Sequence, residues 1–246
     1  MSEYLLPIQV LMYMNIDEIE QELGVMQLSD SFFPTGIYAT SNGLEFLFTE
    51  KKIHGMADLI KLIRINITQQ IGPSDCVALG NVFDSANKHD FDQVIEADNI
   101  IFATKSIKEI RDASIRSGVQ LIKCVVEFVK DDKILNQYNE NIIKNKVHGI
   151  FPVAFAVCCN ALKIKKEKSM MMMMYGFTVG IVGAALRLGL IQHFEGQKII
   201  HNVKPIISQT IKENSNKSLL EIWQFAPQID IVQMSHEKMD SKMFIT

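Results

Sequence analysis

The side chains best placed to do chemistry in this sequence are three candidate metal ligands, His193, Glu195 and His201. Imidazole and carboxylate groups bind zinc and similar metals, and a further acid such as Glu45 could serve as a general base. The spacings of the three ligands do not place all of them on one face of a helix. A metal-dependent hydrolase on a helical scaffold is therefore one alternative function, which dialysis followed by elemental analysis would test.

Motifs that would identify other catalytic chemistry are absent. The sequence has no G-x-x-x-x-G-K-[ST] loop for nucleotide phosphates, no G-x-G-x-x-G fingerprint and no G-x-S-x-G elbow. His236 and Glu237 begin like a zincin motif, but Asp240 stands where the second histidine is needed. The sequence thus predicts a protein that is not an enzyme and binds no cofactor stably.

Composition indicates a globular chain in a reducing compartment. The 246 residues are 48% hydrophobic and 22% charged, which suffices for a sizeable core in one domain or two. The formal net charge of −3 gives no basic face for nucleic acid. The four cysteines show no C-x-x-C spacing, and the N-terminus lacks the basic region of a signal peptide. We expect a cytoplasmic protein.

Helical periodicity dominates the chain, beginning with a helix capped by Asn15 and Glu18 that turns Ile16, Ile19 and Leu23 inward. A second helix is predicted over residues 56–71. It should stop at Gly72, with Pro73 opening the next helix, which ends at residues 87–89 before a cap at Asp90.

Residues 92–129 predict two helices separated near residues 104–106, with Ser106 and Glu109 as a capping box. On the second helix Ala113, Ser114 and Gly118 would let another backbone approach closely. Residues 130–145 are charged and rich in asparagine, which favours a loop with a short helix over a linker between domains.

Two apolar segments follow, residues 151–162 and residues 169–186. The second is uncharged over about eighteen residues, which is long enough to span a membrane, so a membrane-anchored helical protein is another alternative. Its five methionines and three glycines, with Arg187 directly after it, favour a helix buried in a soluble bundle.

The C-terminal part predicts a break near Gly189, a helix from about Glu195, and a kink or end at Pro205. Beyond Pro227, the C-terminal tail (residues 228–246) alternates polar and apolar residues without an obvious partner in the core. Such a tail often becomes ordered on binding. With no convincing β-type run, the prediction is an all-α bundle of about eight to ten helices in one domain, residues 1–227, followed by this tail.

Residues 27–50 connect two apolar helical faces through a polar, turn-forming segment. Pro34 fixes φ, Gly36 can take φ > 0, and Asn42 with Glu45 reads as a helix cap. The aromatic residues Phe32, Phe33 and Tyr38 could either pack into the core or face a partner.

This stretch, LSDSFFPTGIYATSNGLE, resembles the N-terminal signature of the UreF family of urease accessory proteins. Further similar blocks follow in the family's order: EIRDASIRSGVQLI, HGIFPVAFAVCCNALKI, RLGLIQHFEGQKII and FAPQIDIVQMSHEKMDSKMF. The likeness extends over nearly the whole chain.

The resemblance implies a helical, non-catalytic scaffold that forms a homodimer. It implies binding to UreD (also called UreH) and to the GTPase UreG, and coupling of GTP hydrolysis to nickel insertion into apo-urease, with nickel as cargo rather than cofactor. Membrane and nucleic acid are not expected partners. The positions that match family motifs, and that the likeness implies for partner binding, are Pro34, Gly36, Tyr38, Ser41, Gly43, Glu45, Arg111, Ser114, Arg187, Gln192, Gln197, Asp230, His236 and Glu237.

Three positions depart from the family pattern. Ile37 replaces a second glycine, Asp240 replaces an aromatic residue, and Lys242 stands where an arginine is usual. A lysine lacks the planar fork with which arginine binds a carboxylate through two hydrogen bonds. The resemblance gives neither the geometry of the dimer nor the surface that meets the GTPase.

Overall fold

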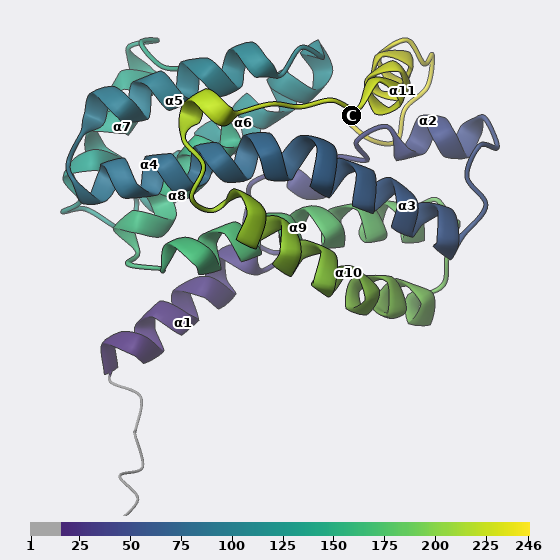
Figure 1. Cartoon of the computed structure of the whole chain (residues 1–246), viewed down its shortest axis with the longest axis horizontal. Helices are drawn as coiled ribbons and strands as arrows, with labels where there is room; N and C mark the ends of the chain where they lie inside the picture. Colours follow the sequence, from purple (N-terminus) through teal and green to yellow (C-terminus); the bar gives the residue numbers. More distant parts are fainter. Residues whose placement is uncertain (1–15) are drawn as a thin grey trace, which may run out of the picture.

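The computed structural model describes residues 16–246, which form α-helices, one π-helical segment and two 3₁₀ turns, with no strand in that range (Figure 1). The all-α prediction is confirmed, while the predicted cap at Asn15 lies outside the described residues. The helices are α1 Ile16–Ser29, α2 Leu44–Thr49, α3 Met56–Asn66, α4 Val77–Asn87, α5 Phe91–Thr104, α6 Lys108–Val125, α7 Lys133–Ile143, α8 Phe151–Ala161, α9 Lys166–Arg187, α10 His193–Asn214 and α11 Pro227–Glu237.

Helices α3 and α4 form one continuous rod, joined by the π-helical segment Ile67–Cys76 (Figure 1). The predicted stop at Gly72 and Pro73 is therefore wrong. The wider π turn accommodates a proline that has no N–H to donate. Gly72 lets the rod lie close to α10, because a Cβ on Gly72 would come within 2.2 Å of the Thr210 side chain. The rod ends at Asn87 and Asp90 caps α5, as predicted.

The core is centred on α8, which packs against α4 and α6. Its neighbouring cysteines, Cys158 and Cys159, are both fully buried, and burial raises the pKa of the Cys159 thiol to about 12. They act as small apolar side chains.

The predicted close approach to α6 is confirmed at its small residues. A Cβ on Gly118 would lie 2.1 Å from the Gly149 carbonyl oxygen, and the Phe151 N–H donates to Ser114 Oγ at 3.2 Å. The start of α8 therefore rests directly on the α6 backbone.

Helix α9 is the one helix among the described residues that is long and apolar enough to cross a membrane. It packs between α8 and α10, and 61% of its most apolar window is buried inside the protein. Met171 and Tyr175 remain on an exposed edge. Its packing is that of a core helix with one open side.

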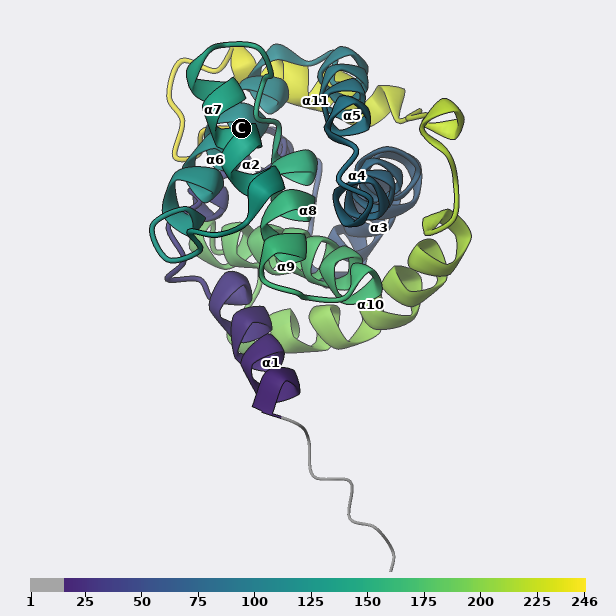
Figure 2. The same ribbon diagram turned by 90° about the vertical axis from the view of Figure 1, so that its left-hand side faces the viewer.

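Helix α10 begins at His193 with a capping box between Gln192 and Glu195, and it continues through Pro205 to Asn214, so Pro205 does not end it. The predicted inner face of α1 is wrong. Helix α1 turns Ile16, Ile19 and Leu23 toward solvent, and its inner side is the opposite one, where Leu28 is buried. Figures 1 and 2 show α1 projecting from the bundle.

The C-terminal tail has partners within the chain, contrary to expectation. Helix α11 packs against α2 and α6, and Ile229 and Phe244 are buried. The residues after α11 return to the loop between α1 and α2. Whether the tail also binds a partner stays a prediction.

Candidate functional site

The distinctive residues of the loop before α2 and of the C-terminal tail meet at one place, which we call the loop–tail junction (residues 39–45 with residues 236–246). Backbone hydrogen bonds join them: the Ile245 N–H donates to the Ala39 carbonyl at 2.8 Å, and the Ser41 N–H donates to the Thr246 carbonyl at 2.7 Å. The Ser41 hydroxyl donates to the same Thr246 carbonyl oxygen at 2.5 Å. The end of the tail is thus held along the loop by backbone hydrogen bonds.

Glu45 binds the tail and does not cap its own helix. Asn42 lies at φ 51° and Gly43 is the N-cap residue of α2 at φ 87°, while Ser41 Oγ accepts a hydrogen bond from the Glu45 N–H in the first turn at 3.3 Å. The Glu45 carboxylate accepts hydrogen bonds from the Met243 N–H at 2.6 Å and the Phe244 N–H at 3.1 Å. The predicted pairing with Asn42 is wrong because two backbone donors of the tail compete for this carboxylate.

His236 lies between two carboxylates and is fully buried. Its Nε2 is 3.0 Å from Glu45 Oε2 and its Nδ1 is 2.7 Å from Glu109 Oε2. Glu109 therefore does not form the predicted capping box, and the N-cap residue of α6 is Ile107, which gives no side-chain cap. The Lys242 ammonium donates to Glu109 Oε1 at 2.8 Å, so two carboxylates face two basic groups.

The junction favours the ionised form of Glu45. Burial raises the pKa of this carboxyl group, but hydrogen bonds from the Met243 N–H, from His236 and from the Phe244 N–H outweigh it and hold the pKa below its ordinary value of 4.5. A cluster of four side chains, Glu45, Glu109, His236 and Lys242, therefore holds the tail.

A cation–π contact and a close approach of α2 to α11 complete the junction. The Arg187 guanidinium lies 4.4 Å from the centre of the Phe244 ring, at the end of α9. A Cβ on Gly43 would lie 2.7 Å from Val232 Cγ1 of α11, so only glycine lets the two elements touch. The first turn of α2 and α11 are in direct contact.

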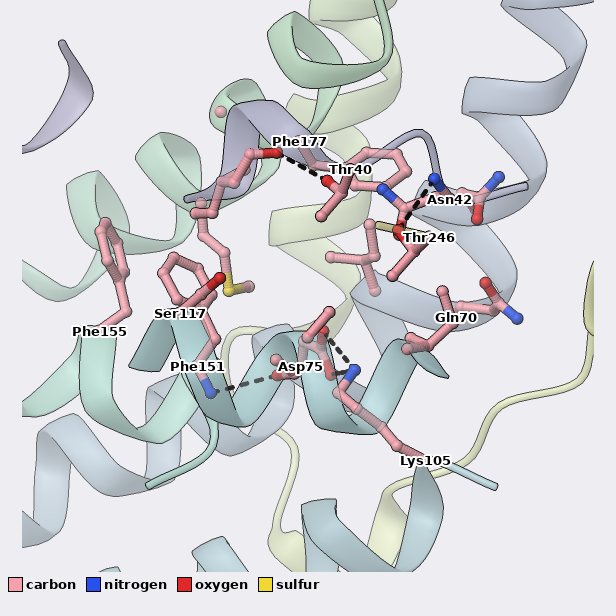
Figure 3. Close-up of a pocket in the computed structure, with 18 of the residues that line it drawn as sticks. Thr40, Asn42, Gln70, Asp75, Lys105, Ser117, Phe151, Phe155, Phe177 and Thr246 are labelled. Atoms are coloured by element: carbon pink, nitrogen blue, oxygen red, sulfur yellow. Dashed lines mark hydrogen bonds and ion pairs between the residues drawn. The ribbon is translucent and has the colours of Figure 1, made fainter. Parts of the chain in front are cut away.

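A cavity of about 190 Å³ lies beside the junction (Figure 3). Figure 3 shows Phe151, Phe155 and Ser117 at one side, with Asn42, Gln70 and Thr246 at the other. The Lys105 ammonium binds both oxygens of Asp75, at 2.8 and 2.9 Å, on a further part of the wall. The space is apolar at one end and polar at the other.

The residues expected to bind partners divide between three settings. Ser41, Gly43, Glu45, Arg187 and His236 build the loop–tail junction, whereas Tyr38, Ser114 and Asp230 line the cavity. The remaining matched positions are mostly exposed. Pro34, Gly36, Gln192 and Gln197 lie at the surface apart from both, and half-buried Arg111 donates to the Lys105 carbonyl and stacks on Phe102. Glu237 belongs to the junction with an exposed side chain, and its carbonyl accepts a hydrogen bond from the Lys242 ammonium at 3.0 Å.

Sequence reasoning missed several residues of this site. Glu109 was assigned to a local cap, Lys242 was noticed only as a departure from arginine, and Gln233 and Thr246 gave no signal. The aromatic pair of the loop is divided, because Phe33 is buried while Phe32 is 92% exposed. The left-handed conformation expected at Gly36 is confirmed, with φ 77°.

The alternative metal cluster is not assembled. His193 and His201 are exposed, and the Glu195 carboxylate accepts a hydrogen bond from the Gln192 N–H at 2.8 Å. Glu45 is engaged with His236. Within residues 16–246, no three histidine, cysteine or acidic side chains are grouped as metal ligands.

These features define an all-α protein whose distinctive residues hold the C-terminal tail against the loop before α2. The chain belongs to the UreF family, whose model matches residues 53–204. The match spans the core from the α2–α3 connection to α10, while the loop–tail junction lies largely outside it.

Relatives are similar over nearly their whole length. A urease accessory protein UreF from Trichodesmium erythraeum is 30% identical over 92% of this chain and 97% of its own. Proteins of the same name from Bacillus sp. (strain TB-90) and Actinobacillus pleuropneumoniae serotype 5b are 26% and 25% identical, over 91% and 90% of this chain and 98% and 97% of their own. Because these relatives are named as accessory proteins, family membership agrees with the prediction that the chain is not an enzyme.

Proposed function

We propose that this protein is a urease maturation scaffold that binds a UreD (UreH) partner and the GTPase UreG, and couples GTP hydrolysis to nickel insertion into apo-urease. The observation that carries the proposal is the match to urease accessory proteins over 90–92% of this chain and 97% of theirs. Nickel is the cargo of the complex in this proposal, and this chain holds none stably.

The tail presents a surface suited to the UreD-like partner. While Ile229 and Phe244 face inward, four apolar side chains on the tail stay exposed: Ile231 at 64%, Met234 at 49%, Met243 at 64% and Ile245 at 44%. Apolar side chains on an ordered segment supply contact area with little further ordering cost. The junction thus prepares the tail for binding by fixing it before the partner arrives.

The partner surface of the tail is tested with Ile231→Ser and Met234→Ser together. The chain is co-expressed with the UreD and UreG homologues of the same genome, and the complex is isolated through a tag on UreD. We expect the double variant to keep its helical circular dichroism but to lose co-purification and urease activation. Leu220→Ser, at a side chain that is 91% exposed away from the tail, is the matched control and should leave both unchanged. Equal recovery of the double variant and the control would contradict the proposal.

Tyr38 tests the contact with the GTPase. It is half-buried at the edge of the cavity, so part of its ring remains available to a partner. Tyr38→Ala should weaken assembly with UreG while the helical circular dichroism stays intact, and Tyr38→Phe should retain most of the binding. A variant that no longer folds would assign Tyr38 to the core instead.

The scaffold acts in the cytoplasm as a homodimer in this proposal. Exposed apolar side chains on α1 and on the edge of α9 support self-association, and a net charge of −3 gives no support to nucleic-acid binding. Light scattering of the purified chain should give twice the monomer mass, and the chain should be recovered from lysate without detergent. Recovery only in detergent extracts would return α9 to the role of a membrane anchor.

A further inference from the structure

The cavity beside the loop–tail junction has an apolar end and a polar end, and the proposed function assigns no ligand to it. Phe151, Phe155 and Phe177 lie in its wall, together with the methionines Met172 and Met173 of α9. Gln233 of α11 lines it as well, next to the loop: a Cβ on Gly43 would lie 3.4 Å from Gln233 Cγ. Figure 3 shows the aromatic side chains of α8 across the space from Asn42 and Thr246.

Two nearly buried polar side chains of the wall have no hydrogen-bond partner. The side chain of Gln233 forms no hydrogen bond with any residue of 16–246 although the residue is only 4% exposed, and the same holds for the Ser117 hydroxyl at 7%. No side-chain nitrogen or oxygen in that range is both sealed from solvent and unpaired. The Gln233 amide and the Ser117 hydroxyl therefore open onto the cavity, and each is left to be satisfied by whatever occupies it.

The basic group of the same wall is already paired. Lys105 and Asp75 neutralise each other, with side chains only 12% and 14% exposed. The other two carboxylates of the wall accept hydrogen bonds from neutral groups, Asp230 from Gln70 Nε2 at 2.9 Å and Asp30 from the Phe32 N–H at 2.8 Å. An anionic occupant would therefore find no counter-ion of its own, whereas Gln233 and Ser117 offer neutral groups that donate and accept hydrogen bonds.

We propose that this cavity is a binding site for a small neutral molecule with an apolar body and an amide-type head. The body lies against Phe151, Phe155 and Phe177, and the head exchanges hydrogen bonds with the Gln233 amide, with Ser117 as a second polar contact. The volume of about 190 Å³ fits one substituted ring, since an apolar cavity of about 150 Å³ holds benzene. The site is independent of partner docking on the outer face of the tail.

Benzamide is the probe, titrated into the purified full-length chain and followed by protein-detected NMR. Three compounds of similar size vary one property each: benzoate is an anion, benzylamine is a cation, and toluene has no polar head. We expect saturable shifts with benzamide, with the other three at least about threefold weaker. Gln233→Leu should weaken benzamide about fivefold, and Ser117→Ala should weaken it less. Gln228→Leu, the same change at an exposed position of α11, should leave the affinity unchanged.

Each other outcome overturns the proposal. Equal affinity for toluene and benzamide would mean an apolar void without a polar subsite, and tighter binding of benzoate or benzylamine would mean a charged ligand. No saturable binding up to the solubility limit of benzamide would mean that water alone satisfies Gln233 and Ser117. Unchanged affinity in Gln233→Leu would place the ligand elsewhere, provided that circular dichroism and melting temperature match the wild type.

Discussion

His236 is the residue on which the loop–tail junction depends, because both of its ring nitrogens face carboxylates. With Glu45 only 7% and Glu109 only 13% exposed at their side chains, each acid relies on this ring for neutralisation. Glu109 also has the Lys242 ammonium as a basic partner, whereas Glu45 has no basic partner besides His236 among residues 16–246. Replacing the ring would leave the Glu45 carboxylate buried beside a second acid with no basic partner.

His236→Leu should therefore destabilise the protein by roughly 3–5 kcal/mol, the usual effect of removing one member of a buried charge pair. Denaturant unfolding followed by circular dichroism measures this change. The matched control is Glu237→Ala, one residue along α11 and exposed, which should change the free energy of unfolding by less than about 0.5 kcal/mol. Similar values for the two variants would mean that the cluster contributes no net stability.

Glu45 should make the folded state sensitive to acid. Its folded-state pKa lies below the ordinary value of 4.5, so its contribution to stability is complete above that value and is lost as the pH falls through the folded-state pKa. We expect Glu45→Gln to flatten the loss of unfolding free energy between pH about 5 and about 3. Parallel profiles for wild type and Glu45→Gln would contradict this.

Asp230 should act with the opposite sign. Burial raises the pKa of its carboxyl group and outweighs the hydrogen bond from Gln70, which lowers it. Asp230→Asn should therefore steepen the loss of unfolding free energy as the pH falls.

Of the two acids beside His236, the sequence predicted Glu45 as a site residue and Glu109 only as a helix cap, and it predicted the partner of neither. Glu45 and Glu109 each follow a possible cap residue at the spacing of a capping box, and local pattern offers no competing partner. The competing partner is His236, which is 191 residues from Glu45 and 127 from Glu109 in the chain. Since a carboxylate binds where charge and buried donors are strongest, the distant contact prevails over the local one.

At the scale of the helices, sequence periodicity predicted most elements and failed where tertiary contacts override local preference. A helix was expected to stop before Pro73, and Pro205 was expected to kink or end its helix, yet both prolines lie inside helical segments. In the first case the π turn and the contact of Gly72 with α10 keep the rod continuous. The small residues of α6, in contrast, were interpreted correctly, because a helical glycine carries a conformational cost that only close packing justifies.

Gly118 and Gly176 allow a matched test of that packing. Gly118→Ala places a methyl group 2.1 Å from the Gly149 carbonyl oxygen, which is backbone and cannot rotate away, so the free energy of unfolding should fall by about 2 kcal/mol or more. At Gly176, also inside a helix, nothing lies within 4 Å of an added Cβ. Gly176→Ala should be neutral or stabilise by up to about 1 kcal/mol, the difference in helix propensity. Thermal and denaturant unfolding of the two variants measure both effects, and equal destabilisation would show that α6 and α8 are not in rigid contact.

For the whole molecule, the docked tail changes the expected effect of a truncation. Deleting residues 228–246 would uncover Glu45 and Glu109, remove His236, and expose the surfaces that bury Ile229 and Phe244. We expect a clear fall in melting temperature in addition to the loss of the UreD complex. Scanning calorimetry of the truncated chain measures it, and an unchanged melting temperature would mean that the tail is only loosely attached in solution.

The hydrogen bond between Ser41 and Thr246 also joins residues 205 positions apart, which has a kinetic consequence. During synthesis, the loop before α2 emerges early, and the residue that binds it follows only 205 positions later. Contacts of such long sequence separation pay a large loop-closure entropy and form late in folding. Until the tail docks, the carboxylates of Glu45 and Glu109 stay hydrated. The partly synthesised chain therefore exposes two acidic side chains that the folded protein buries. Burial of these two carboxylates by the tail thus distinguishes a folded chain from a nascent one.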